Sequence, residues 1–200
     1  MKKIKIFIIA TVVFFSGIST FGQDGFYTNL GYDITIPMGN TRDFISNTSF
    51  RGFTMSFGDF VTDNIAVEFR WSWHVFYQEM PYDEYSDGTR TVSGKQYRYI
   101  NSFPLAVGGK YFFTGSGVRP YIGFGLGAYK LRKRTDMGIF YSETRQWQFG
   151  LTPEAGILYT FDNGVGIMAN ARYDVMFKAG DIDNQSNLAF SLGFVFSSGL

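Results

Sequence analysis

The 200-residue sequence has no cysteine and a single histidine, His74. The lack of cysteine excludes disulfides, thiolate metal sites and a lipid-modified cysteine anchor. One histidine alone excludes a cluster of histidine ligands. Charge is balanced as well, since 18 basic and 17 acidic residues leave a formal net charge of +1. A chain so close to neutral offers no basic surface for nucleic acid, and we expect no nucleic-acid partner.

Long apolar runs are absent apart from one near the N-terminus. Three lysines within the first five residues precede an apolar run over 6–15, and small residues follow it. This order is typical of a secretory signal, and the run is too short to span a bilayer comfortably. We predict a signal peptide over 1–22 and a single domain over 23–200.

What the rest of the chain has in abundance is aromatic residues (20%) and glycine (24 residues), which favour strands and turns. Apolar and polar residues alternate with period two along most of it. The segment 65–77 shows this most sharply, with isoleucine, valine, phenylalanine, tryptophan and tyrosine on one face and charged or polar residues on the other. The pattern predicts eight strands, at about 26–38, 50–60, 65–77, 97–113, 118–131, 147–161, 165–177 and 187–196.

The predicted connections alternate in length. Short turns fall at 62–64, 114–117 and 162–164, and longer polar loops at 39–49, 79–96, 132–143 and 178–186. In an antiparallel series this places every short turn at one end and every long loop at the other, which is typical of outer-membrane barrels with short periplasmic turns.

Two barrel types have one apolar face: a membrane barrel and a lipocalin-like soluble barrel. Trp71, Trp73 and Trp147, with many Phe and Tyr, would overfill the interior of an eight-stranded barrel. Aromatics near strand ends, such as Tyr27 and Tyr77, suit interfacial belts. We therefore predict an all-β, eight-stranded antiparallel transmembrane β-barrel in the outer membrane of a Gram-negative bacterium.

Several segments also look familiar. The run RPYIGFGLG at 119–127 resembles a strand of the OmpA-, OmpX- and OmpW-like small barrels, the outer membrane protein beta-barrel domain superfamily. The segments 103–112, 152–157 and 192–196 resemble neighbouring strands. The resemblance implies outer-membrane lipid and lipopolysaccharide as surroundings and the barrel-assembly machinery as a partner during insertion.

The polar face carries charges in the middle of strands, where a membrane barrel must turn them inward. We predict that they meet as an interior network of salt bridges, with Arg98 as a further candidate, because buried charges persist only when paired. Its members are Glu68, Arg70, His74, Lys110, Glu154, Arg172 and Asp174. A dense network would plug the lumen and leave a structural or surface-interaction role. A looser one would line a narrow porin-like channel for small polar or hydrophobic solutes.

Two surface features suggest binding. The tyrosine- and charge-rich loop 79–96 is a candidate for an extracellular ligand, since loops on rigid scaffolds carry recognition, although a simple solvated loop fits equally. A basic cluster of Lys130, Arg132, Lys133 and Arg134 would suit lipopolysaccharide phosphates, or would form a solvated rim.

No enzyme or cofactor is expected. Ser72 and His74 share a face with Glu68, but the lipid side of that strand is apolar, so a lipid-modifying hydrolase is disfavoured. The glycines at 123, 125 and 127 superficially resemble a dinucleotide fingerprint, but they open no helix; we interpret them as room inside a crowded barrel strand.

Overall fold

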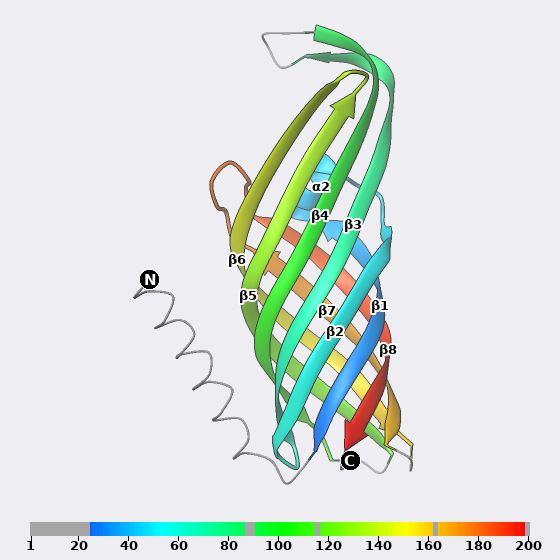
Figure 1. The fold of residues 1–200 in the computed structure, drawn as a ribbon, viewed down its shortest axis with the longest axis vertical. Coiled ribbons are helices and arrows are strands. Elements are labelled where there is room, and N and C mark those ends of the chain that lie inside the picture. Colours follow the sequence, from blue (N-terminus) through cyan, green and yellow to red (C-terminus); the bar gives the residue numbers. More distant parts are fainter. Residues whose placement is uncertain (1–24, 87–90, 115–116, 162–163, 199–200) are drawn as a thin grey trace, which may run out of the picture.

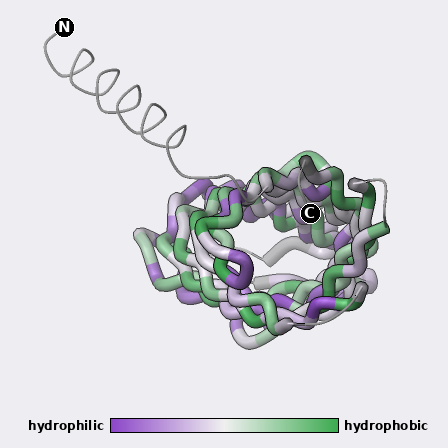
Figure 2. Tube along the Cα trace, turned by 90° about the horizontal axis from the view of Figure 1, so that it is seen from below, coloured by the Kyte–Doolittle hydropathy of each residue, from purple (hydrophilic) through white to green (hydrophobic). Residues whose placement is uncertain are grey.

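The computed structural model describes residues 25–86, 91–114, 117–161 and 164–198, and these form eight antiparallel strands closed into a barrel (Figures 1 and 2). Each strand pairs with the next along the chain, and the last pairs with the first. The eight-strand prediction is thereby confirmed, whereas the predicted signal peptide at 1–22 lies outside the described residues. The strands are β1 (Phe26–Met38), β2 (Ser49–Thr62), β3 (Ile65–Ser86), β4 (Thr91–Phe112), β5 (Val118–Met137), β6 (Phe140–Thr160), β7 (Val165–Met176) and β8 (Gln185–Ser198).

The barrel has two unlike ends. Both described chain ends and the short turns lie at one, the turn end. Gly117 and Gly164 adopt positive φ there, at 81° and 75°, as turns of this kind require. Among the described residues only glycines have positive φ, so Asn64 in the β2–β3 turn does not. The opposite end, the loop end, carries the short helix α2 (Gly39–Phe44) and the β7–β8 connection.

Four strands rise far above the others at the loop end (Figure 1). β3 to β6 have 20–22 residues each, against 12–14 for the other four. β3 and β6 continue beyond the residues that pair with β2 and β7. These upper parts of β3 and β6, with the segments of β4 and β5 that pair with them, form what we call the projecting wall; it lies within 76–149. The predicted loops 79–96 and 132–143 were therefore wrong in extent, because most of their residues continue the strand ladders.

The outer face of the barrel is apolar. Trp71, Trp73 and Trp147 point outward with 38–50% of their surface exposed, as the crowding argument predicted. On β5 the outward positions are apolar from Val118 up to residue 128 and become basic at Lys130, which marks the upper edge of the apolar band. Burying this band in lipid removes a large apolar area from water. One predicted belt residue was misplaced, because Tyr27 faces inward and is fully buried.

The inward face is arranged in three levels along the barrel axis. Apolar side chains fill the turn end, with Tyr27, Phe60, Phe112, Tyr121 and Leu158 among them. Charged and polar side chains occupy the middle. A second apolar cluster fills the loop end, where Phe76, Ile100 and Leu131 pack with Ile45 from beyond α2 and Ile182 from the β7–β8 connection.

Candidate functional site

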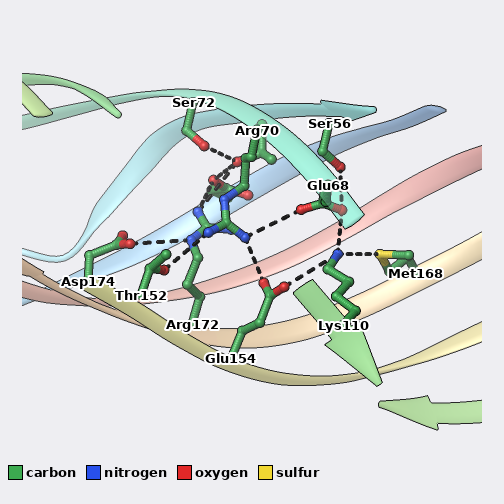
Figure 3. A network of polar contacts seen from close by, with 12 residues as sticks. Ser56, Glu68, Arg70, Ser72, Lys110, Thr152, Glu154, Met168, Arg172 and Asp174 are labelled. Carbon is green, nitrogen blue, oxygen red and sulfur yellow. Dashed lines mark hydrogen bonds and ion pairs between the residues drawn. The ribbon is translucent and has the colours of Figure 1, made fainter. Parts of the chain in front are cut away.

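The middle level of the interior holds a network of buried charges drawn from five of the strands (Figure 3). The seven residues singled out in the sequence are all buried there, none more than 8% exposed: Glu68, Arg70, His74, Lys110, Glu154, Arg172 and Asp174. They point inward because each occupies the polar phase of its strand's alternation. The geometry divides them into a lower and an upper group.

The lower group is organised around Glu68 on β3. Its Oε2 accepts hydrogen bonds from Lys110 Nζ at 2.5 Å and from Tyr27 and Ser56 hydroxyls at 3.0 Å. Lys110 also lies 3.4 Å from Glu154 Oε1, and Arg70 donates to Glu154 Oε2 at 2.8 Å. Two acids and two bases thus link β3 to its neighbour β4 and, across the lumen, to β6.

The upper group is organised around Asp33 on β1. Its Oδ2 lies 3.0 Å from Arg172 Nη2 and 2.8 Å from His74 Nε2, and it also accepts a hydrogen bond from Thr54. Arg172 Nε lies 3.6 Å from Asp174 Oδ1 on the same strand, β7. The arrangement ties β1, β2, β3 and β7 together.

Asp33 was missing from the sequence-based set, although it is fully buried and is the hub of the upper group. The signal was present in the sequence, because Asp33 shares the polar phase of its strand with Asn29 and Thr35. With it, the buried charged side chains of the described residues comprise four carboxylates and three Lys or Arg cations. His74 adds a fourth positive charge when it is protonated.

Interior glycines make the network sterically possible. A Cβ at Gly123 would come within 2.8 Å of Glu154 Oε1, and one at Gly125 within 2.8 Å of Thr152 Cγ2. A Cβ at Gly58 would meet the ring of Tyr27 at 2.2 Å. Glycine at these positions therefore leaves the room that large interior side chains occupy.

One small cavity lies within this network. The cavity beside Glu68, Arg70, Lys110 and Glu154 has a volume of about 10 Å³. That is about the volume needed by the centre of one water molecule, so a hydrated solute does not fit there. Apolar clusters lie above and below these charges along the barrel axis.

Arg98 does not join this network. It lies at the loop end, where its Nη1 donates to the carbonyl oxygen of Phe44 at 3.1 Å and its Nε to Gln96 Oε1 at 2.6 Å. On β4, Arg98 lies four residues from Ser102, toward the loop end, with the apolar residue Ile100 between them on the same face. Alternation alone therefore could not distinguish Arg98 from a charge in the middle of the barrel.

The basic cluster at the upper end of β5 is split between the two faces of the wall. Lys130 faces outward, with Nζ 5.8 Å from the centre of the Trp147 ring. Arg132 and Arg134 pair with Glu143 and Asp136, each at 2.6 Å. Lys133 occupies the opposite phase and lies over the ring of Phe44 at the mouth of the barrel.

The residues considered for hydrolase chemistry have other partners. Ser72 Oγ lies 2.8 Å from Thr54 Oγ1, and His74 is bonded to Asp33, both fully buried. Within the described ranges no group of three or more His, Asp or Glu side chains is placed to hold a metal ion. In the same residues, no helix is long and apolar enough to cross a membrane.

Comparison with known proteins gives the family. Residues 7–196 match the family described as "Outer membrane protein beta-barrel domain". The chain belongs to this family. This confirms the resemblance and places the protein in the outer membrane of a Gram-negative bacterium. A search of curated proteins found no match.

Solved structures agree on the fold. Neisserial surface protein A is 18% identical, with a TM-score of 0.58, covering 86% of this chain and 95% of its own. Ail of Yersinia pestis, solved with the heparin analogue sucrose octasulfate, is 15% identical at a TM-score of 0.55, covering 88% and 100%. OprG of Pseudomonas aeruginosa is 13% identical at 0.54, covering 90% and 99%. At these identities the likeness concerns the fold alone.

Proposed function

We propose that this protein is a sealed outer-membrane barrel that works through its extracellular surface and does not conduct solutes. The observation that carries the proposal is the three-level filling of the lumen, with about 10 Å³ free beside the central charges. Paired charges lock such an interior, because separating them would leave each one desolvated and alone. The porin-like alternative requires a continuous polar path, which the two apolar clusters interrupt.

The projecting wall supports a surface-interaction role. It contains most of the segment 79–96, which was predicted as a binding loop and which forms strand in the structure. Its tip exposes large side chains: Tyr82 has 71% of its surface exposed, Ile139 90% and Tyr141 70%. Exposed aromatic and apolar groups of this size are typical of contact surfaces. The sulfated ligand in the Ail structure is a further reason to expect binding, rather than transport, from a barrel of this shape.

Conductance of the purified barrel in a planar bilayer tests the sealed lumen. We expect insertion without discrete current steps, because no hydrated path crosses the interior. Insertion is verified independently by protection of the strands from protease on both sides of the bilayer. Reproducible steps from the folded barrel would favour the narrow channel and overturn the proposal.

We also infer a lipopolysaccharide contact, narrower than the four-residue cluster expected from the sequence. Lys130 stands at the upper edge of the apolar band, and Arg132 and Arg134 lie above it on the same outer face. Cations at this height suit the phosphates of the outer leaflet. Lys133 faces inward and is excluded.

Substituting Lys130→Gln with Arg132→Gln tests this contact. The stabilisation that lipopolysaccharide adds to the barrel in vesicles should shrink, while Lys178→Gln, at the exposed β7–β8 connection, should leave it unchanged. Equal stabilisation of the unmodified protein, the double variant and Lys178→Gln would contradict the proposed lipopolysaccharide contact. Insertion by the barrel-assembly machinery stays a prediction.

A further inference from the structure

The mouth of the barrel holds two cations on one aromatic ring. Phe44 ends α2 and packs against the upper apolar cluster. Lys133 Nζ lies 3.9 Å from the centre of its ring, and the guanidinium carbon of Arg98 lies 5.1 Å from the same point. Two like charges therefore share one small space, and each adds to the electrostatic cost of the other.

The strand register fixes this juxtaposition. Lys133 on β5 pairs across to Ile100 on β4, and Arg98 is two residues from Ile100 on the same inward face. The two side chains are thus diagonal neighbours, within reach of a common partner. Phe44 is only partly buried, as are both cations, so this spot remains open to solvent at the loop end.

Neither cation is neutralised by an acid in the part of the chain that the structure describes. Arg98 donates to the Gln96 side chain and a backbone carbonyl, both uncharged. The acid that acts on Lys133 is Asp183, which is itself paired with Lys178 at 2.8 Å. Burial and the charge of Arg98 hold the pKa of Lys133 below its usual value.

The outer face of the same strand provides the contrast. There Arg132 lies 2.6 Å from Glu143, and Arg145 lies 2.5 Å from the same carboxylate. Among the described residues, the chain thus supplies an acid to the outward arginines of this region and leaves the inward pair without one.

We propose that Arg98 and Lys133 form an anion-binding site for the phosphate or sulfate group of a soluble ligand. The guanidinium N–H groups of Arg98 that do not donate to Gln96 or Phe44, beside the Lys133 ammonium, match a tetrahedral oxyanion, and such charge-assisted hydrogen bonds are the strong ones. The site lies on the inner face of the wall, away from the surrounding lipid, so the anion comes from the extracellular solution. This proposal rests on the proposed function in one respect: the lumen is sealed, and the mouth of the barrel faces the extracellular solution.

The test is a titration of the whole barrel, in phospholipid nanodiscs, with inorganic phosphate and then sulfate. Amide NMR shifts are expected to saturate and to concentrate at Phe44, Arg98 and Lys133. Lys133→Met keeps the apolar stem over the ring but removes the charge, and should weaken binding roughly tenfold or more, the scale of one lost charge-assisted bond. Lys95→Met, which removes a lysine paired with Glu79 on the projecting wall, should change it little.

Shifts that never saturate, or equal affinity of the two lysine variants, would overturn the site. A repeat in nanodiscs that contain lipopolysaccharide separates the two sources of phosphate. Unchanged affinity is the expected result, and competition by the lipid would overturn the assignment to a soluble ligand. Conductance steps would contradict the sealed lumen of the proposed function but would not affect the evidence for this anion-binding site.

Discussion

Two ion pairs of nearly equal length show how different the two regions of this barrel are. In the lumen, Lys110 Nζ and Glu68 Oε2 are 2.5 Å apart, with side chains 3% and 4% exposed. On the projecting wall, Lys95 Nζ and Glu79 Oε1 are 2.6 Å apart, with side chains 54% and 44% exposed. The chemistry and the distance are alike, and only the surroundings differ.

In the lumen the cost of removing charge from water dominates. A single carboxylate oxygen of Glu68 accepts three hydrogen bonds, and the cations around it reach further acids. Removing one partner there leaves the others desolvated and unmatched, which costs much more than the pair contributes over an apolar packing. The network therefore restricts which strands can face one another across the lumen.

On the wall, water and salt screen the same kind of pair. Solvent replaces a lost partner at little cost, so the free energy of unfolding depends weakly on any one wall charge. Substitutions in this region therefore leave the stability of the barrel nearly unchanged. The difference assigns stability to the lumen, and the binding role proposed for the wall does not depend on it.

The largest expected effect comes from breaking the upper half of the network. Arg172→Ala leaves Asp33 and Asp174 without their cation, and should lower the free energy of unfolding by about 3–5 kcal/mol. Urea unfolding of the barrel in lipid vesicles, followed by tryptophan fluorescence, measures the change. The double variant Asp33→Asn with Arg172→Met, which removes both charges, should lose less than Arg172→Ala.

Lys95→Ala is the matched control on the wall. We expect no measurable shift of its unfolding midpoint, because Glu79 is then solvated by water. If Arg172→Ala and Lys95→Ala lowered the free energy of unfolding equally, the lumen would be as hydrated as the projecting wall, and the difference between the two regions would not hold.

Sequence reasoning succeeded where one face of a strand meets lipid. Period two is strict there, and it placed Glu68 and Arg172 inward correctly because a charge facing the bilayer costs about 2–4 kcal/mol. Above the apolar band both faces of the wall meet water, so alternation fades while the backbone ladder continues. The extra length of β3 to β6 therefore left no pattern to detect.

The sequence could not show which charged side chains meet across the lumen, for a different reason. Alternation tells which way a side chain points, but the height at which it meets another depends on strand register around the closed barrel. This is why Arg98 was grouped with the mid-barrel charges although it lies beside Phe44. α2, with six residues, is too short to show helical periodicity.

A smaller effect is expected from adding one methyl group to each region. In the lumen, the Cβ of Gly58→Ala would clash with the ring of Tyr27, so that fully buried ring must move and its hydrogen bond to Glu68 is disturbed. Overpacking of this kind costs about 1–3 kcal/mol. On the wall, a Cβ at Gly94 meets Met137 at 3.7 Å, an ordinary contact, so Gly94→Ala should be neutral. The same urea titration decides between them, since equal stability of the two variants would show that the interior yields as easily as the wall.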